Sequence, residues 1–302
     1  MPTEPETPPA CPNCGRPVRV AEECLQCAMS SALEAVKASP PEMDLGEEVE
    51  GFASFAEPKL PARMGRFVLL SRLGHGGMGT VYEAEDMELQ RVVALKMIRS
   101  QQFAGASEKQ RFKRDALATA KLDHRHIVPV YETGEMDGCP FLTMKLIRGG
   151  TLADLMSHGP LPAEQAASIL AKVAAALQHA HDHGVLHRDL KPSNILIDEQ
   201  GEPWLTDFGL ARLRTGAPHE TLHGAQIGTP MYMAPEQAAG RSDEVGPATD
   251  VWALGVLLYQ MLSGRTPYDQ GENLAVIQRV LSEPPPRLEV STPRKLSSPN
   301  HF

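Results

Sequence analysis

A glycine-rich turn between two strand-like segments is the feature that most restricts what this chain can fold into. Gly74, Gly76 and Gly79 form a G-x-G-x-x-G pattern that lies between FVLLSRLG (67–74) and TVYEAED (80–86), both predicted strands. Glycine lets a backbone approach a phosphate closely, because no Cβ stands in the way. Dinucleotide-binding folds place this pattern between a strand and a helix. The strand–turn–strand context therefore argues against that fold and indicates a different nucleotide-binding sheet.

The rest of the chain separates into a strand-rich part and a helix-rich part. Alternating and β-branched residues predict further strands over 92–98, 127–134 and 140–147, with a helix over 107–121. After Gly150 the pattern is helical. Pro162 marks a helix start and Gly184 its end, with an apolar face at Ile169, Leu170, Val173 and Leu177, and further helices are predicted over 248–262 and 273–283. The predicted fold class is α+β, with a small sheet lobe, a hinge near 145–150 and a larger helical lobe.

Composition and charge exclude several functional classes. The 302 residues are 42% hydrophobic, which is enough for a substantial core, and the net charge of -9 argues against a nucleic-acid binder with a basic surface. The N-terminus MPTEPETPPA has no apolar run of the kind found in signal peptides, and VWALGVLLYQML (251–262) is too short to cross a bilayer. We therefore expect a cytoplasmic location, no membrane span and no nucleic-acid partner.

The first 64 residues hold eleven acidic and five basic side chains, so -6 of the net charge lies there. Two C-x-x-C pairs, formed by Cys11 with Cys14 and by Cys24 with Cys27, suit one tetrahedral Zn²⁺. CPNCG resembles a zinc knuckle, and four thiolates leave no open coordination position, so the predicted role is structural. Disulfides, which a reducing cytosol disfavours, and a relic without metal are the alternatives. The Pro-, Glu- and Ala-rich stretch 31–64 reads as a linker.

Two other groups of metal-binding residue types receive a structural interpretation. Cys139 stands alone before a predicted strand and reads as a core or edge residue. The run HAHDHGVLH brings four histidines together in sequence: His179, His181, His183 and His187. Helical residues two positions apart do not share a face, so the first three cannot easily converge on one metal ion. Packing is the preferred interpretation of these histidines.

The polar octet HRDLKPSN (187–194) has two interpretations. It can be a polar loop in which Asp189 or Asn194 caps a turn, or a catalytic loop in which an acid accepts a hydroxyl proton and an amide holds a metal ion. The surrounding motifs favour the second. VALK, which ends at Lys96, precedes the octet, DFG (207–209) follows it, and GTPMYMAPE ends at Glu236.

These five motifs in this order resemble the eukaryotic-type Ser/Thr protein kinases, in the form common in bacteria, over roughly residues 65–285. The resemblance implies the two-lobed protein kinase fold, ATP and Mg²⁺ as cofactors, and protein substrates. It assigns acceptance of the hydroxyl proton to Asp189, stabilisation of the transferring group to Lys191, phosphate neutralisation to Lys96 and magnesium binding to Asn194 and Asp207. It places the nucleotide at Leu73, Gly74, His75, Gly76, Gly77, Met78, Gly79, Thr80, Val81, Ala94, Lys96, Met144 and Ile147.

The same resemblance implies regulation by phosphorylation. Arg188 would pair with a phosphate on the activation segment and thereby order it. The segment runs from Asp207 to Glu236, and its exposed hydroxyl candidates are Thr215 and Thr221, with Thr221 ranked first. Lys191 and Thr229 are marks of the Ser/Thr type.

The sequence departs from the family pattern in two places. The glutamate that pairs with the strand lysine is replaced by Asp115, which is shorter by one C–C bond, about 1.5 Å. We predict that Asp115 still pairs with Lys96, because the helix can shift inward. After 273–283 the chain becomes PPPRLEVSTPRKLSSPNHF, where family members continue with helices. This predicts a large lobe without its last helices, an exposed apolar patch, self-association through that lobe, and no late arginine partner for Glu236.

The resulting division of the chain has five parts. These are a zinc knuckle at 1–30, the linker at 31–64, the N-lobe at 65–147, an incomplete C-lobe at 148–286 and a coil tail at 287–302. The preferred hypothesis is an active Ser/Thr protein kinase with activation-loop autophosphorylation. An ATP-binding pseudokinase or truncated relic that acts through contacts is the second hypothesis, and a zinc knuckle that docks a partner is the third.

Overall fold

The structure is a computed structural model that describes residues 59–76, 79–98, 106–136, 138–208, 230–269 and 271–289. The chain divides into two compact units, Met1–Gly46 and Glu47–Phe302, and all the described residues belong to the second. The four cysteines of the predicted zinc knuckle lie outside the described residues, as do 290–302 of the predicted tail.

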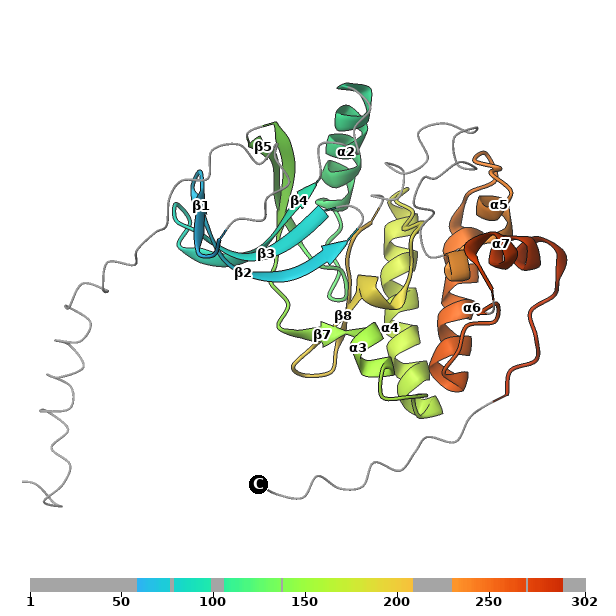
Figure 1. The fold of residues 1–302 in the computed structure, drawn as a ribbon. Helices are drawn as coiled ribbons and strands as arrows, with labels where there is room; N and C mark the ends of the chain where they lie inside the picture. Colours follow the sequence, from blue (N-terminus) through green and yellow to red (C-terminus); the bar gives the residue numbers. More distant parts are fainter. Residues whose placement is uncertain are drawn as a thin grey trace, which may run out of the picture. The chain divides into compact units, whose positions relative to one another are not determined.

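A six-stranded antiparallel sheet forms the first part of this unit (Figure 1). Its spatial order is β1-β2-β3-β4-β6-β5. The strands are β1 (Ala62–Met64), β2 (Phe67–Gly76), β3 (Gly79–Asp86), β4 (Arg91–Ile98), β5 (Val130–Met136) and β6 (Cys139–Met144). The predicted strands are present, and the glycine-rich turn joins β2 to β3 as expected.

Strand β1 corrects the predicted linker, which was placed at 31–64. Ala62 and Met64 are each 2% exposed and face the core, whereas Arg63 between them is exposed. A strand of three residues shows only one alternation of buried and exposed side chains, which is too short to be recognised within a Pro- and Glu-rich sequence. The sheet lobe therefore begins before residue 65.

Strand β4 explains why the sheet lobe has two cores. Its side chains alternate, so that Val93, Leu95 and Met97 join one apolar cluster, while Ala94 and Ile98 join another. A strand covered on both faces reads as a continuous apolar run, as VVALKMI does. Helix α2 (Ala106–Thr119) closes the second cluster with Phe112 and Ala116.

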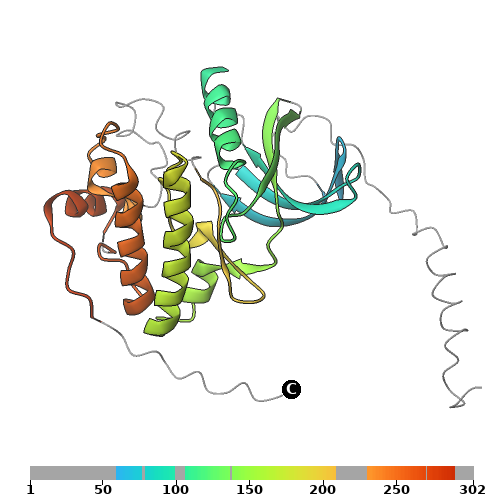
Figure 2. The ribbon, with the colours of Figure 1, turned by 180° about the vertical axis from the view of Figure 1, so that it is seen from behind.

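The remaining elements form the helical lobe (Figures 1 and 2). A small antiparallel sheet of order β7-β8-β9 accompanies the helices. The elements are β7 (Gly149–Thr151), α3 (Leu152–Met156), α4 (Ala163–Asp182), the 3-10 turn η2 (Pro192–Asn194), β8 (Ile195–Asp198), β9 (Pro203–Leu205), η4 (Pro230–Tyr232), α5 (Pro235–Ala238), α6 (Pro247–Ser263) and α7 (Asn273–Ser282).

Helices α4 and α6 lie side by side and supply about half of the buried residues in the main apolar cluster of this lobe. The apolar stripe of α4 buries Ile169, Val173 and Leu177, as the sequence pattern predicts, against α6 residues such as Leu257. Gly184, which follows α4, has φ +72°, a conformation that favours glycine and ends the helix where it was predicted.

Helix α6, whose sequence is apolar nearly all round, packs against α4 and, through Trp252, against the cluster of Tyr268, Val276 and Val280. Val251 is 59% exposed, and α7 exposes Leu274 and Leu281 at 61% and 47%. These are three apolar side chains exposed in the large lobe, and the apolar patch that the sequence analysis expects there stays a prediction. Within the described residues, none of the helices combines the length and the apolar character needed to cross a bilayer.

Candidate active site

The octet HRDLKPSN forms a tight loop between α4 and β8. Lys191 Nζ lies 2.6 Å from Asp189 Oδ2, and both side chains are about four-fifths buried, with 20% and 21% exposure. Asn194 Nδ2 donates to the backbone oxygen of Asp189 at 2.7 Å. The structure therefore brings together the three residues that the sequence assigned to the chemistry of this loop.

Asp250 of α6 holds this loop, and sequence reasoning missed it. Its carboxylate, which is 1% exposed, accepts the backbone N–H groups of His187 at 2.9 Å and Arg188 at 2.8 Å. His181 Nε2 lies 2.8 Å from Asp250 Oδ2. These bonds hold Arg188 at φ +67°, a strained conformation for a non-glycine residue. A carboxylate in an apolar helix was the available signal, since a buried charge needs partners.

His187 is a packing residue, as the sequence interpretation held. It is fully buried, its Nε2 donates to the backbone oxygen of Thr206 at 2.9 Å, and its ring lies 4.9 Å from the Phe208 ring. Within the part of the chain that the structure describes, no three His, Cys, Asp or Glu side chains are grouped so that they could hold a metal ion. His187 thus ties the catalytic loop to the segment that carries Asp207.

Lys96 on β4 pairs with Asp207 and not with Asp115. Its Nζ lies 2.6 Å from Asp207 Oδ2, and the lysine side chain is 7% exposed. The predicted Lys96–Asp115 pair is not formed in this structure, where Asp115 Oδ1 lies 3.7 Å from Arg114 Nε. A cavity of about 20 Å³ separates Ala116 and Thr119 of α2 from residues 206–208. In this structure the Lys96 ammonium is thus paired with Asp207, and a small cavity lies between α2 and the segment that carries that carboxylate.

Asn194 and Asp207 stand at the two ends of the β8–β9 hairpin. Asn194 immediately precedes β8, Asp207 lies two residues after β9, and Thr206 N donates to Asn194 O at 3.1 Å. The hydrogen bonds of the Asn194 amide to described residues are made by its nitrogen, so its oxygen is available to a cation. Amide and carboxylate oxygens are ligands that Mg²⁺ takes. These two residues fit the predicted magnesium site.

Four of the five predicted adenine contacts lie in or against one apolar cluster. Ala94 and Met144 are 6% exposed and are paired across β4 and β6, and Val81 and Ile147 pack against the same cluster. Leu73, the fifth, is 49% exposed. Leu196 of β8 also packs against this cluster and was missed, although it lies in a predictable place, two residues after Asn194.

The glycines of the turn have different reasons to be glycine. Gly79 has φ +150°, and a Cβ there would lie 1.8 Å from the backbone oxygen of Met97, so packing alone requires it. A Cβ on Gly74 or Gly76 would meet no atom within 4 Å. Those two positions need no glycine for the fold, which is consistent with a requirement set by a bound phosphate. His75 Nδ1 lies 2.9 Å from Thr80 Oγ1 across the turn, and Gly77 and Met78 are outside the described residues.

Glu236 lies against α6. Its carboxylate accepts a hydrogen bond from the Thr249 hydroxyl, and Thr249 is 2% exposed. The next residue, Gln237, donates to the backbone oxygen of Arg188 at 2.8 Å, so α5 contacts the catalytic loop directly. The predicted regulatory residues Thr215 and Thr221 and the substrate-loop residue Thr229 lie outside the described residues.

Comparison with known proteins agrees with this geometry. A family model described as "Protein kinase domain" matches residues 67–300. Serine/threonine-protein kinase PknD of Mycobacterium tuberculosis is 41% identical over 235 residues, which are 78% of this chain and 35% of PknD. The DNA damage-responsive serine/threonine-protein kinase RqkA of Deinococcus radiodurans is 39% identical over 226 residues, which are 74% of this chain and 33% of RqkA. The chain thus spans about a third of the length of these relatives.

A solved structure supports the fold directly. The kinase domain of PknI from Mycobacterium tuberculosis superposes with a TM-score of 0.61 at 27% sequence identity, covering 77% of this chain and 83% of that domain. The family match extends over more than half of the chain, and it includes the glycine-rich turn, the catalytic loop and the hairpin that carries Asn194 and Asp207. The chain therefore belongs to the protein kinase family, among relatives that are bacterial serine/threonine kinases.

Proposed function

We propose that this protein transfers the γ-phosphoryl group of ATP to serine and threonine hydroxyls of proteins. The observation that carries the proposal is the convergence of Asp189, Lys191 and Asn194 in one loop, with Asp207 at the far end of the hairpin that begins there. Family membership and the bacterial Ser/Thr kinase relatives support the same activity.

The residues of this chain divide the work of that reaction. The Asp189 carboxylate accepts the proton of the substrate hydroxyl and orients its oxygen for in-line attack on the γ-phosphorus, as the bond to the ADP oxygen breaks. Lys191, 2.6 Å from Asp189, supplies positive charge beside the transferring group. Asn194 and Asp207 would hold Mg²⁺, which neutralises phosphate charge when bound. Lys96 would then leave Asp207 and pair with a phosphate of the nucleotide.

Phosphate transfer from labelled ATP to a generic basic protein tests this proposal. The full chain should label the protein on serine and threonine with Mg²⁺ present, and a chelator should stop the reaction. An ATP-binding pseudokinase, the second hypothesis, would bind nucleotide without labelling the protein. Labelling of Thr221 in the chain itself would support the predicted autophosphorylation, in which Arg188 pairs with the new phosphate.

Asp115 is expected to pair with Lys96 in the nucleotide-bound state. If Asp207 held Mg²⁺, Lys96 would lose the carboxylate it contacts here at 2.6 Å, and Asp115 is an acid on the neighbouring helix α2. Asp115→Ala should lower kcat/KM by roughly 10²-fold, the cost of a misplacement of about 1 Å at an active site. Asp115→Glu should keep or raise activity, because the longer side chain closes the gap.

Steady-state kinetics of both variants provide the measurement, with Lys113→Ala on the exposed side of the same helix as a control for helix stability. An Asp115→Ala enzyme with wild-type kinetics would show that the pair is not used.

We also propose that Cys11, Cys14, Cys24 and Cys27 hold one structural Zn²⁺. The spacing of the two C-x-x-C pairs supports this. Metal analysis of gently purified protein should give about one zinc per chain, and a Cys11→Ser and Cys14→Ser double variant should lose it. Removing residues 1–58 should leave transfer activity unchanged, since the described lobes begin after them. Protein without zinc before any chelation would contradict the zinc site.

Two further expectations concern the whole protein. The exposed apolar residues Val251, Leu274 and Leu281 support self-association through the large lobe. Light scattering over a concentration series should then show species larger than a monomer. A cytoplasmic location rests on the sequence features alone.

A further inference from the structure

The segment from Glu202 to Asp207 is tied to a different part of the fold at almost every residue. The middle of the segment is strand β9, and Asp207 at its end is the predicted metal ligand that contacts Lys96. The residues between Glu202 and Asp207 form hydrogen bonds to three parts of the fold. Pro203 O accepts from His126 Nδ1 (2.9 Å), Leu205 N donates to His126 O (2.8 Å) and Leu205 O accepts from Val128 N (2.9 Å). Trp204 Nε1 donates to Asp198 Oδ2 (2.8 Å), and Thr206 N donates to Asn194 O (3.1 Å).

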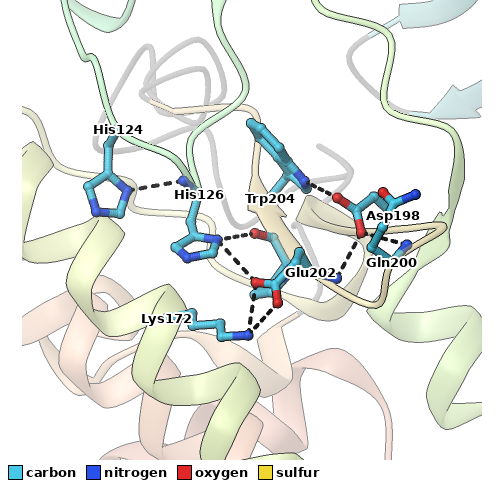
Figure 3. A network of polar contacts seen from close by, with 8 residues as sticks. His124, His126, Lys172, Asp198, Gln200, Glu202 and Trp204 are labelled. Carbon is cyan, nitrogen blue, oxygen red and sulfur yellow. Dashed lines mark hydrogen bonds and ion pairs between the residues drawn. The ribbon is translucent and has the colours of Figure 1, made fainter.

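The tie at the start of the segment is an ion pair with helix α4. Lys172 Nζ lies 2.7 Å from Glu202 Oε1 and 2.8 Å from Oε2, so the ammonium contacts both oxygens (Figure 3). His126 Nδ1 lies 4.0 Å from Glu202 Oε2. The hydrogen bonds from Lys172 lower the pKa of Glu202, which keeps the carboxylate ionised at neutral pH. Glu202 thus connects the hairpin to α4 and lies beside the loop that follows α2.

The hairpin turn does not need this ion pair. Asp198 Oδ1 accepts the N–H groups of Gln200 at 3.0 Å and Glu202 at 2.8 Å, and Asp198 Oδ2 accepts Trp204 Nε1, so Asp198 closes the turn. The Glu202 side chain points away from this turn toward Lys172 (Figure 3). Both members of the pair are about one-third exposed, at 34% and 35%, and ion pairs at such sites add little to stability. The ion pair matters because it fixes the position of the β8–β9 hairpin relative to α4.

Two histidines beside the pair, His124 and His126, belong to the loop that follows α2. His126 N donates to His124 Nδ1 at 3.2 Å, which requires that nitrogen to be unprotonated. Burial lowers the pKa of His124, and the neighbouring His179, His126 and Arg125 lower it further, against a smaller opposite effect from Asp123. Lys172, which contacts both carboxylate oxygens at 2.7 and 2.8 Å while His126 Nδ1 lies at 4.0 Å, is the principal partner of Glu202.

We propose that Glu202 is a positioning residue for the metal ligands. With Lys172 it fixes the β8–β9 hairpin on α4 and so sets the separation of Asn194 and Asp207, which stand at the hairpin's two ends. The inference rests on the proposed function only in taking Mg²⁺ with ATP as the ligand. Mg²⁺ demands near-ideal octahedral geometry, whereas Ca²⁺ accepts flexible coordination. Release of the hairpin from α4 should therefore weaken the binding of Mg²⁺ more than the binding of Ca²⁺.

Binding of a fluorescent N-methylanthraniloyl ATP to the full chain, titrated with Mg²⁺ and separately with Ca²⁺, tests this. Loss of a direct second-shell partner typically costs about 10–100-fold in metal affinity, so for this more distant pair we expect Glu202→Gln to raise the Mg²⁺ midpoint about threefold to tenfold. The Ca²⁺ midpoint should change less, and binding without metal should not change. Lys172→Gln should match Glu202→Gln, and the double variant should be no worse than either, because the pair acts as a unit.

The control is Glu199→Gln, which removes an exposed acid from the same hairpin turn and should leave both midpoints unchanged. An unchanged Mg²⁺ midpoint in Glu202→Gln, equal rises for Mg²⁺ and Ca²⁺, or additive effects of the two substitutions would each overturn the inference. Phosphate transfer by the wild-type chain is measured alongside. Its absence would count against the proposed function, while the midpoints still decide the role of Glu202.

Discussion

Asp189→Asn is expected to lower phosphate transfer by about 10²–10⁴-fold while nucleotide binding stays within twofold of wild type, roughly the contribution of a positioned general base. The carboxylate lies in the catalytic loop 2.6 Å from Lys191, and the neutral amide cannot accept the hydroxyl proton in its place. The predicted nucleotide contacts lie on β2, β3, β4 and β6, in the turn between β2 and β3 and at Ile147, away from the substituted side chain.

Transfer kinetics and nucleotide titration on the same preparation provide the measurement for Asp189→Asn. Asp182→Asn, at the exposed end of α4, is the matched control and should behave as wild type. Near-normal turnover in Asp189→Asn would remove Asp189 from the reaction, and loss of nucleotide binding would show that it supports the nucleotide site instead.

Asp250→Ala is expected to lower the free energy of unfolding by about 2–6 kcal/mol, because each of two backbone N–H donors that loses its acceptor costs about 1–3 kcal/mol. The carboxylate is 1% exposed and accepts the backbone N–H groups of His187 and Arg188, which would lose their partner. Transfer activity should fall with stability, because the same two bonds hold the catalytic loop in its strained conformation at Arg188.

Chemical denaturation and transfer kinetics test the role of Asp250. Asp243→Ala removes an exposed acid from the loop before α6 and should leave both quantities unchanged. Asp250→Asn keeps the side-chain shape and one acceptor oxygen, so a folded variant is expected with reduced kcat. A stable and fully active Asp250→Asn enzyme would show that loop geometry does not depend on the carboxylate.

The sequence predicted an element well where a local residue pattern matched the way that element is buried. VVALKMI predicted β4 because both faces of that strand are buried, and the apolar stripe from Ile169 to Leu177 predicted α4 because one helical face packs on α6. Strand β1 was missed because three residues carry no measurable period. The motif residues of the catalytic loop were found because their chemistry is concentrated in eight consecutive positions.

The missed features are long-range contacts or depend on conformational state. Asp250 is 63 residues from His187 in sequence, and nothing local to TDVW indicates which N–H groups it accepts. The pairing of Lys96 with Asp207 depends on the position of α2, which residue identity alone cannot give. Lys172 and Glu202 are 30 residues apart and belong to no motif, so their contact emerges only from the packing of the hairpin on α4.

The central claim is that this chain transfers phosphate to protein hydroxyls with the residues gathered around the β8–β9 hairpin. Phosphoamino acid analysis after incubation of the full chain with γ-labelled ATP, Mg²⁺ and a basic protein tests it most directly, with Asp189→Asn prepared in parallel. The account predicts label on serine or threonine in the wild-type reaction, loss of at least about 10²-fold in Asp189→Asn, and none without divalent metal. Absence of label from a wild-type chain that binds ATP, or equal label with both proteins, would contradict it.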